Sequence, residues 1–162
     1  MLGLMKLPLS GRQYFRIAGG SFLDRPQRYR TVGVNMAREI KLPCEVWVPT
    51  KDFNTPDLFW LHQGVAEAVD AVIRGKRVYV GCMGGRGRTG LFLAIMAKTF
   101  GVQSPITYVR DNYYAHAVET MAQAKYVHDY VPDPEVLARI AYARKRFRWL
   151  PFNNLTYWPK PL

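Results

Sequence analysis

The chain has 162 residues, of which 49% are hydrophobic and 14% aromatic, so it suits a folded domain with a sizeable core and excludes disorder over most of its length. Its 23 lysine and arginine residues outnumber 12 acidic ones, and the formal net charge of +11 favours an acidic partner or substrate. No apolar run is long enough to cross a bilayer, and two cysteines, Cys44 and Cys82, exclude a disulfide framework and favour a reducing, cytoplasmic location.

The first third of the chain predicts short strands separated by loops. We expect residues 1–10 to be a loosely held end, because they show no clear period. Residues 21–30 carry three arginines and predict a basic surface loop with solvated side chains. Residues 35–42 have room for a helical turn. Alternating or β-branched residues predict three strands, at residues 14–18, 31–34 and 44–48.

From residue 55 on, the chain predicts mostly helices. Thr55 as N-cap, Pro56 in the first helical position and Asp57 in the first turn predict a helix that ends near Gly75. Residues 76–80 then form a short strand. Helical spacing and start signals predict four more helices, at residues 89–100, 105–114, 121–130 and 134–149. This order predicts an α/β fold with a small, mostly parallel central sheet flanked by helices.

We expect a single domain over residues 1–162, with its core at about residues 12–132 and a basic helix and aromatic tail over residues 133–162. The tail is expected to be extended and packed through Phe152, Tyr157 and Trp158. The helix carries five basic residues without an acidic one among them. Such a run is typical of a solvated face, but a basic amphipathic helix can also bind acidic lipid or nucleic acid. The five basic residues are Arg139, Arg144, Lys145, Arg146 and Arg148.

One stretch organises the chain: an apolar strand ends in Cys82, a glycine-rich loop follows, and a helix begins. Cys82, five further residues and then Arg88 and Thr89 form a pattern that suits the cleavage of phosphate esters. A thiolate attacks phosphorus, a guanidinium binds two phosphate oxygens, and the threonine hydroxyl donates to the thiolate. At a helix N-terminus, we expect the pKa of Cys82 to fall from about 8.5 towards the range of about 3.5–7.5.

The loop after the cysteine is predicted to bind the phosphate group with its backbone. Consecutive N–H groups can curl into an anion-binding nest, and Gly84, Gly85 and Gly87 allow the positive φ angles and the close approach that a nest requires. The two cysteines and three scattered histidines form no metal-ligand pattern, so we expect neither metal nor cofactor. The predicted phosphate-binding residues are Met83, Gly84, Gly85, Arg86, Gly87 and Arg88.

The leaving alkoxide or phenoxide needs a proton, and the chain offers two candidate acids. Asp52 lies on a loop with Pro49 and Pro56 near its ends, and after giving its proton it can take one from the attacking water. Asp57 is the rival, although an early helix residue more commonly complements the helix dipole. We therefore predict that Asp52 is the general acid.

At these residues the sequence resembles the superfamily of cysteine-dependent protein tyrosine and dual-specificity phosphatases. The likeness is closest to the branch that contains the cyclin-dependent-kinase-associated phosphatase and the Cdc14-type enzymes. Residues 52–57 resemble that branch's D-G-x-T-P acid loop, and residues 82–90 and 117–123 match two further blocks. Asp52 precedes Cys82 by 30 residues, which also fits. The resemblance covers residues 45–130 and implies Cys82 as nucleophile, Arg88 as phosphate clamp, Thr89 as hydroxyl partner and Asp52 as acid.

Gln123 enters only through this resemblance, which implies that it positions the hydrolytic water. The chain departs from the family at Gly81, where a histidine that helps to order the loop is usual, and at Arg86, where many relatives have an apolar residue and phosphoinositide and inositol-phosphate phosphatases often have lysine. The chain also has a short N-terminal region and no tyrosine-rich loop for phosphotyrosine recognition. These differences imply a weaker activation of the thiolate and a shallower, more cationic pocket.

The resemblance implies a phosphoric monoester hydrolase of the protein tyrosine or dual-specificity type, which acts on phosphorylated protein through a cysteinyl-phosphate intermediate. We expect it to be a monomer. The first alternative keeps the mechanism and takes a polyanionic substrate, such as a phosphoinositide, an inositol polyphosphate or an RNA 5′-phosphate. The second alternative is a phosphate-binding module with weak catalysis.

Overall fold

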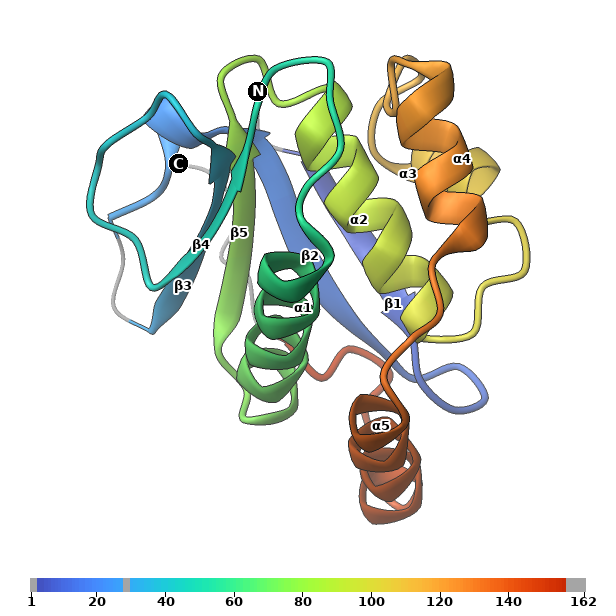
Figure 1. Cartoon of the computed structure of the whole chain (residues 1–162). Coiled ribbons are helices and arrows are strands. Elements are labelled where there is room, and N and C mark those ends of the chain that lie inside the picture. Colours follow the sequence, from blue (N-terminus) through green and yellow to red (C-terminus); the bar gives the residue numbers. More distant parts are fainter. Residues whose placement is uncertain (1–2, 28–29, 157–162) are drawn as a thin grey trace.

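The structure, a computed structural model, describes residues 3–27 and 30–156 and has an α/β fold around one five-stranded sheet (Figure 1). The strands lie in the order β1-β2-β5-β3-β4. β1 pairs antiparallel with β2, whereas β2, β5, β3 and β4 run parallel. The predicted α/β fold with a mostly parallel sheet is therefore confirmed. The strands are β1 (Gly3–Pro8), β2 (Tyr14–Ser21), β3 (Thr31–Ala37), β4 (Val46–Thr50) and β5 (Arg77–Cys82).

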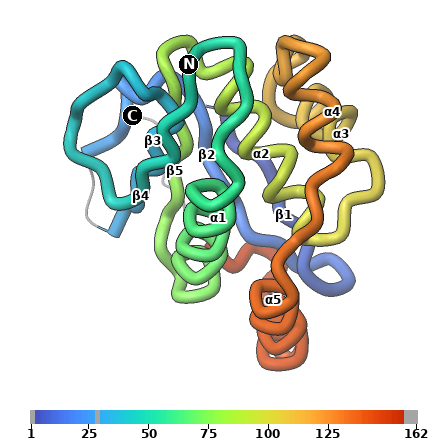
Figure 2. Tube along the Cα trace, in the orientation of Figure 1, coloured from blue at the N-terminus to red at the C-terminus, as the bar shows by residue number. Residues whose placement is uncertain are grey.

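Helices flank the sheet, as Figures 1 and 2 show: α1 and α2 lie in front of it, α3 and α4 lie beyond α2, and α5 lies at the end opposite the loop that joins β5 to α2. A short 3-10 helix, η1 (Phe22–Asp24), follows β2. The α-helices are α1 (Leu58–Ile73), α2 (Gly87–Thr99), α3 (Pro105–Asn112), α4 (Met121–Asp129) and α5 (Pro134–Phe147). In the described part of the chain, none of the helices has both the length and the hydrophobicity needed to cross a bilayer.

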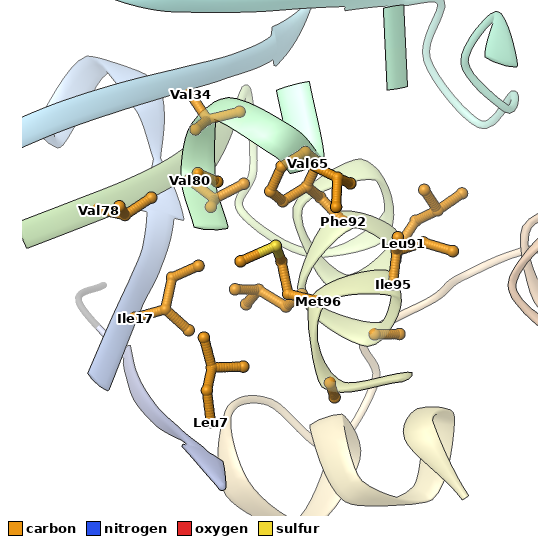
Figure 3. Close-up of a cluster of buried hydrophobic side chains, with 14 of the residues drawn as sticks. Leu7, Ile17, Val34, Val65, Val78, Val80, Leu91, Phe92, Ile95 and Met96 are labelled. Carbon is orange, nitrogen blue, oxygen red and sulfur yellow. The ribbon is translucent and has the colours of Figure 1, made fainter. Parts of the chain in front are cut away.

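The core forms where α2 packs on the sheet. Nearly every residue of α2 is buried, as its almost uninterrupted run of apolar residues requires. Figure 3 shows side chains of α2 together with side chains of β1, β2, β3, β5 and α1. Burying each large apolar side chain contributes about 1.5–3 kcal/mol, so this contact holds α2, and with it the loop at its N-terminus, against the sheet. The labelled residues are Leu7, Ile17, Val34, Val65, Val78, Val80, Leu91, Phe92, Ile95 and Met96.

The N-terminal segment is not loose. Residues 3–8 form the edge strand β1, in which Met5 and Leu7 are buried. The six residues are too few to show their alternation without the partner strand β2. At the other end of the chain, Val136 and Ile140 of α5 are buried in the same hydrophobic cluster.

The predicted helical turn at residues 35–42 is wrong. β3 continues to Ala37, where its register with β4 shifts, and the chain then turns back. The buried side chain of Asn35 makes the turn: its Oδ1 accepts from the N–H of Ala37 at 2.9 Å and its Nδ2 donates to the carbonyl of Ile40 at 2.8 Å. An asparagine side chain thus supplies the bonds that a helical turn would have supplied.

The N-cap of α1 is Asp57 and not Thr55. Asp57 has an extended backbone, and its Oδ1 accepts from the N–H of Phe59 at 2.9 Å. The prediction was wrong by two residues because both side chains are good caps and only the turn of the chain selects one.

Several basic side chains have partners within the fold. Arg25 is nearly buried and binds both carboxylate oxygens of Glu45, at 2.7 and 2.9 Å. On α5, Arg139 pairs with Asp70 at 3.1 Å, and Arg144 donates to two backbone carbonyls, those of Leu9 and Phe100.

The described part of the tail runs beside β2, and Phe152 lacks its predicted packing. Asn154 forms an isolated bridge with Tyr14, and the N–H of Leu155 donates to the carbonyl of Tyr14 at 3.0 Å. Phe152 is 56% exposed, so its predicted packing is wrong. The other two predicted anchors, Tyr157 and Trp158, lie outside the described residues.

Candidate active site

Cys82 is the last residue of β5, the middle strand of the sheet, and the loop of residues 83–86 joins it to α2. α2 begins at Gly87, two residues before the predicted start, so Arg88 and Thr89 lie in its first turn. Cys82 is 3% exposed, and the hydroxyl of Thr89 donates to its Sγ at 3.1 Å. A buried thiol therefore faces the N-terminus of a long helix, where the free N–H groups and the helix dipole favour an anion.

Arg88 is buried in the same turn and is hydrogen-bonded to Glu39, which follows β3, and to Thr50, the last residue of β4. Its Nη1 and Nη2 donate to the two carboxylate oxygens of Glu39 at 2.8 and 2.7 Å, and Nη1 also donates to the carbonyl of Thr50 at 2.9 Å. Among the described residues its Nε, also buried, has no hydrogen-bond partner. Because buried donors are rarely left unpaired, this N–H is available to an anionic ligand.

Glu39 is the site residue that the sequence did not reveal. It follows β3 in a loop whose place beside the arginine depends on the order of the strands. The hydrogen bond from Arg88 holds the pKa of Glu39 below its ordinary value, which favours the charged carboxylate that binds Arg88. The only sequence signal was an acidic residue near the carboxyl end of a strand.

Asp52 and Asp57 have different positions. Asp52 is exposed, and its Oδ1 lies 3.1 Å from Nη2 of Arg88, whereas Asp57 is occupied as the cap of α1. Phe53, in the place of the glycine of the D-G-x-T-P pattern, has a φ of 58°. A left-handed residue other than glycine costs about 1–3 kcal/mol, and such strain concentrates at functional sites. Of the two candidate acids, Asp52 is thus the one that lies beside Arg88.

The loop of residues 83–86 and Gly87, called the phosphate loop below, is held in place by the close packing of Gly85 and by a hydrogen bond from Tyr113. Of its three glycines, Gly85 alone has a positive φ, 69°, and an added Cβ there would lie 2.5 Å from the carbonyl carbon of Gly20. The hydroxyl of Tyr113 donates to the carbonyl of Gly85 at 2.6 Å. Arg86 is exposed and its guanidinium lies 5.6 Å from the ring centre of Tyr114. The expected positive φ is thus found at Gly85, and the expected close approach at Gly85 and at Gly87, where an added Cβ would meet Oε2 of Glu119, whereas Gly84 shows neither.

Gln123 is fully buried and joins the acid loop to α4. Its Oε1 accepts from the N–H groups of Glu119 and Thr120, and its Nε2 donates to the carbonyl of Asn54 at 3.2 Å. A Cβ added to Gly87 would lie 3.2 Å from the amide of Gln123, so this side chain lies beside the phosphate loop. One of its N–H bonds is left to position a water molecule, a role that stays a prediction.

Gly81 has no room for a side chain. An added Cβ would lie 2.6 Å from Cα and 2.7 Å from the backbone nitrogen of Phe22 in η1. The backbone of η1 therefore packs against β5 just before Cys82.

We expect Gly81→Ala to lower the free energy of unfolding by about 1–3 kcal/mol, the usual cost of overpacking a core. The matched control is Gly84→Ala, because an added Cβ at Gly84 has no atom within 4 Å. Urea denaturation of both variants measures the difference. Equal stabilities would contradict the close packing of η1 on β5.

Cys44 lies apart from this site and is half-buried. Burial, and then the charge of Glu45, raise the pKa of its thiol, which disfavours the reactive thiolate.

Comparisons with known proteins agree with the fold. A protein kinase associated phosphatase (KAP) whose catalytic cysteine is replaced by serine superposes with a TM-score of 0.59 at 18% identity, over 80% of this chain and 92% of that one. Tk-PTP in its active form gives a TM-score of 0.54 at 20% identity, over 76% of this chain and 94% of that one. The chain thus has the fold of the cysteine-dependent phosphatases.

Two uncharacterized proteins of Methanocaldococcus jannaschii are similar in sequence. MJECL20 is 40% identical over 92 residues, which are 57% of this chain and 62% of that protein. MJ0215 is 38% identical over 86 residues, 53% of this chain and 54% of that protein. The matched stretch therefore spans little more than half of each relative. No protein family model matches the chain.

Proposed function

We propose that the protein is a phosphoric monoester hydrolase that works through a cysteinyl-phosphate intermediate. The observation that carries this proposal is the state of Arg88: buried, held by Glu39, and with an unpaired Nε N–H among the described residues, in the same turn as the hydroxyl that binds Cys82. A guanidinium that is oriented in this way can bind a phosphate group in front of the thiol.

In the first step the thiolate of Cys82 attacks phosphorus, and the bond between phosphorus and the ester oxygen breaks. Asp52 gives its proton to the leaving oxygen, while Arg88 and the N–H groups of residues 83–88 stabilise the charge on the other oxygens. In the second step water attacks the cysteinyl phosphate and gives a proton to Asp52. The thiolate leaves, stabilised by the hydroxyl of Thr89, and inorganic phosphate is released.

Two substrate classes suit this chemistry. The resemblance to the kinase-associated and Cdc14-type branch favours a phosphorylated protein, with protein tyrosine or dual specificity. The net charge of +11 and the exposed Arg86 favour a polyanionic phosphate. Because Arg139 and Arg144 have partners within the fold, binding of an acidic surface by α5 would rest on Lys145, Arg146 and Arg148, which are exposed.

Trapping of the intermediate tests this proposal. We expect a brief reaction with an aryl phosphate, stopped by acid, to leave a phosphoryl group on the peptide that contains Cys82, as detected by mass spectrometry. The peptide that contains Cys44 is the internal control. Steady turnover without any phosphorylated Cys82 peptide would argue for a different mechanism, and binding of phosphate without turnover would favour the weak binding module.

A further inference from the structure

We propose that a second anionic group of the substrate binds in an open hollow next to the phosphate loop, so that the preferred substrate carries at least two phosphate groups. The hollow has a volume of about 700 Å³ and is called the basic hollow below. This inference rests on the proposed function and specifies its substrate class. The lining residues are Arg38, Glu39, Lys41, Lys51 and Asp52.

The basic hollow adjoins the candidate active site directly. Its two acidic residues, Glu39 and Asp52, are the two carboxylates that contact Arg88, at 2.7 and 3.1 Å. Each of them is next in sequence to a basic residue of the hollow, Arg38 and Lys51 respectively. A molecule whose phosphate group lies at Arg88 therefore has the basic hollow as its immediate surroundings.

The cations of the basic hollow are exposed and free to bind. No ion pair joins Arg38, Lys41 or Lys51 to an acidic side chain anywhere in residues 3–27 and 30–156. The ammonium group of Lys41 lies 4.6 Å from the ring centre of Trp47, which keeps the side chain close to the surface. Since both carboxylates of the hollow already face Arg88, the three cations are left for an incoming anion.

The loop that carries Arg38 and Lys41 is fixed in place before any ligand arrives. The register shift at the end of β3 and the two bonds of Asn35 define the turn, as described above. The carbonyl of Thr50 accepts from the backbone N–H of Arg38 at 3.2 Å and from Nη1 of Arg88 at 2.9 Å. One oxygen atom thus ties the basic loop to the phosphate-binding arginine, and a preorganised site costs less entropy on binding.

Calorimetric titration in a Cys82→Ser background tests the subsite, with inositol 1-phosphate and inositol 1,4-bisphosphate as probes. We expect the bisphosphate to bind about tenfold more tightly, since each exposed charge pair contributes up to about 1 kcal/mol. The substitutions Arg38→Gln, Lys41→Gln and Lys51→Gln together should remove most of this preference and leave the affinity for the monophosphate within about threefold. A preference that persists in this triple variant overturns the proposal.

The matched control replaces Lys145 and Arg146 of α5 and its C-cap Arg148 by glutamine, which removes the same net charge at the far end of the molecule (Figure 1). It should keep the tenfold preference; an equal loss in both triple variants would show a long-range charge effect and overturn the subsite. Comparing the affinity for vesicles that carry a bisphosphorylated headgroup with the affinity for soluble inositol 1,4-bisphosphate shows whether the substrate is a lipid or a soluble molecule. A peptide with one phosphotyrosine and acidic neighbours that outcompetes the bisphosphate would overturn the inference in favour of a protein substrate.

These titrations need no turnover, so the two proposals fail in different ways. If Cys82→Ser with an intact basic hollow shows no preference for the bisphosphate, while the unmodified protein hydrolyses an aryl phosphate normally, the subsite alone is overturned. Absence of hydrolysis in the unmodified protein, with the preference intact, contradicts the proposed function and supports the subsite.

Discussion

Replacement of Cys82 by serine is expected to lower kcat for an aryl phosphate by about 10⁴-fold or more. A serine hydroxyl has nearly the same size as the thiol but stays protonated in the same surroundings, so it supplies no nucleophile of comparable strength. The hydroxyl of Thr89 donates to Sγ of Cys82 at 3.1 Å and should donate to the serine oxygen in the variant. The two hydrogen bonds from Arg88 to Glu39 should persist. The rate of release of the aryl product measures the effect.

The matched control for this variant is Cys44→Ser. Cys44 is half-buried, and burial raises the pKa of its thiol, so its loss should leave kcat within about twofold of the unmodified protein. Binding of inorganic phosphate to Cys82→Ser, followed by calorimetry, distinguishes a lost nucleophile from a lost fold. Steady turnover by Cys82→Ser would remove Cys82 from the mechanism.

Asp52→Asn is expected to lower kcat by about 10²–10⁴-fold for an alkyl phosphate, whose leaving oxygen needs a proton, and far less for a nitrophenyl phosphate, whose leaving oxygen does not. Asparagine keeps the size of the side chain but cannot give a proton. The dependence of the loss on the leaving group separates the acid role from a simple disturbance of Arg88, from which Oδ1 of Asp52 lies 3.1 Å away.

Asp57→Ala is the counterpart of Asp52→Asn. It removes the cap that accepts from the N–H of Phe59, so the free energy of unfolding should fall by about 1 kcal/mol while kcat stays near that of the unmodified protein. Urea denaturation and the same two substrates give both readouts. If Asp57→Ala damages turnover more than Asp52→Asn does, the two acids have been assigned the wrong way round.

The contact of η1 with β5 beside Gly81 is a product of tertiary packing. From the sequence, a glycine before Cys82 implies a loop without its usual support. In the structure, η1 brings its backbone to within 2.6–2.7 Å of where a Cβ at position 81 would lie. Tyr79 lies two residues before Gly81 in β5, and its hydroxyl donates to the carbonyl of Ser21, the N-cap of η1, at 2.7 Å. This bond also joins β5 to the start of η1. A backbone contact thus supports the strand beside Gly81, and no local pattern in the sequence predicts it.

The elements with local causes could be predicted from the amino-acid sequence. Alternation and β-branching predicted most of the sheet, and a continuous apolar stretch predicted the buried helix α2. The grouping of Cys82, Arg88 and Thr89 also follows from local structure, because a strand, a short loop and one helical turn bring residues seven apart together. Such features depend on neighbours in the chain, so the sequence carries them directly.

The features that join distant segments of the chain could not be predicted in this way. Glu39 reaches Arg88, 49 residues away, because β3 lies next to β5 in the sheet. β1 needs β2 to become a strand, and the basic hollow exists because the ends of β3 and β4 meet beside the phosphate loop. The physical reason is that strand order and the packing of side chains over long separations are properties of the whole fold, whereas periodicity, caps and turn residues act within a few residues.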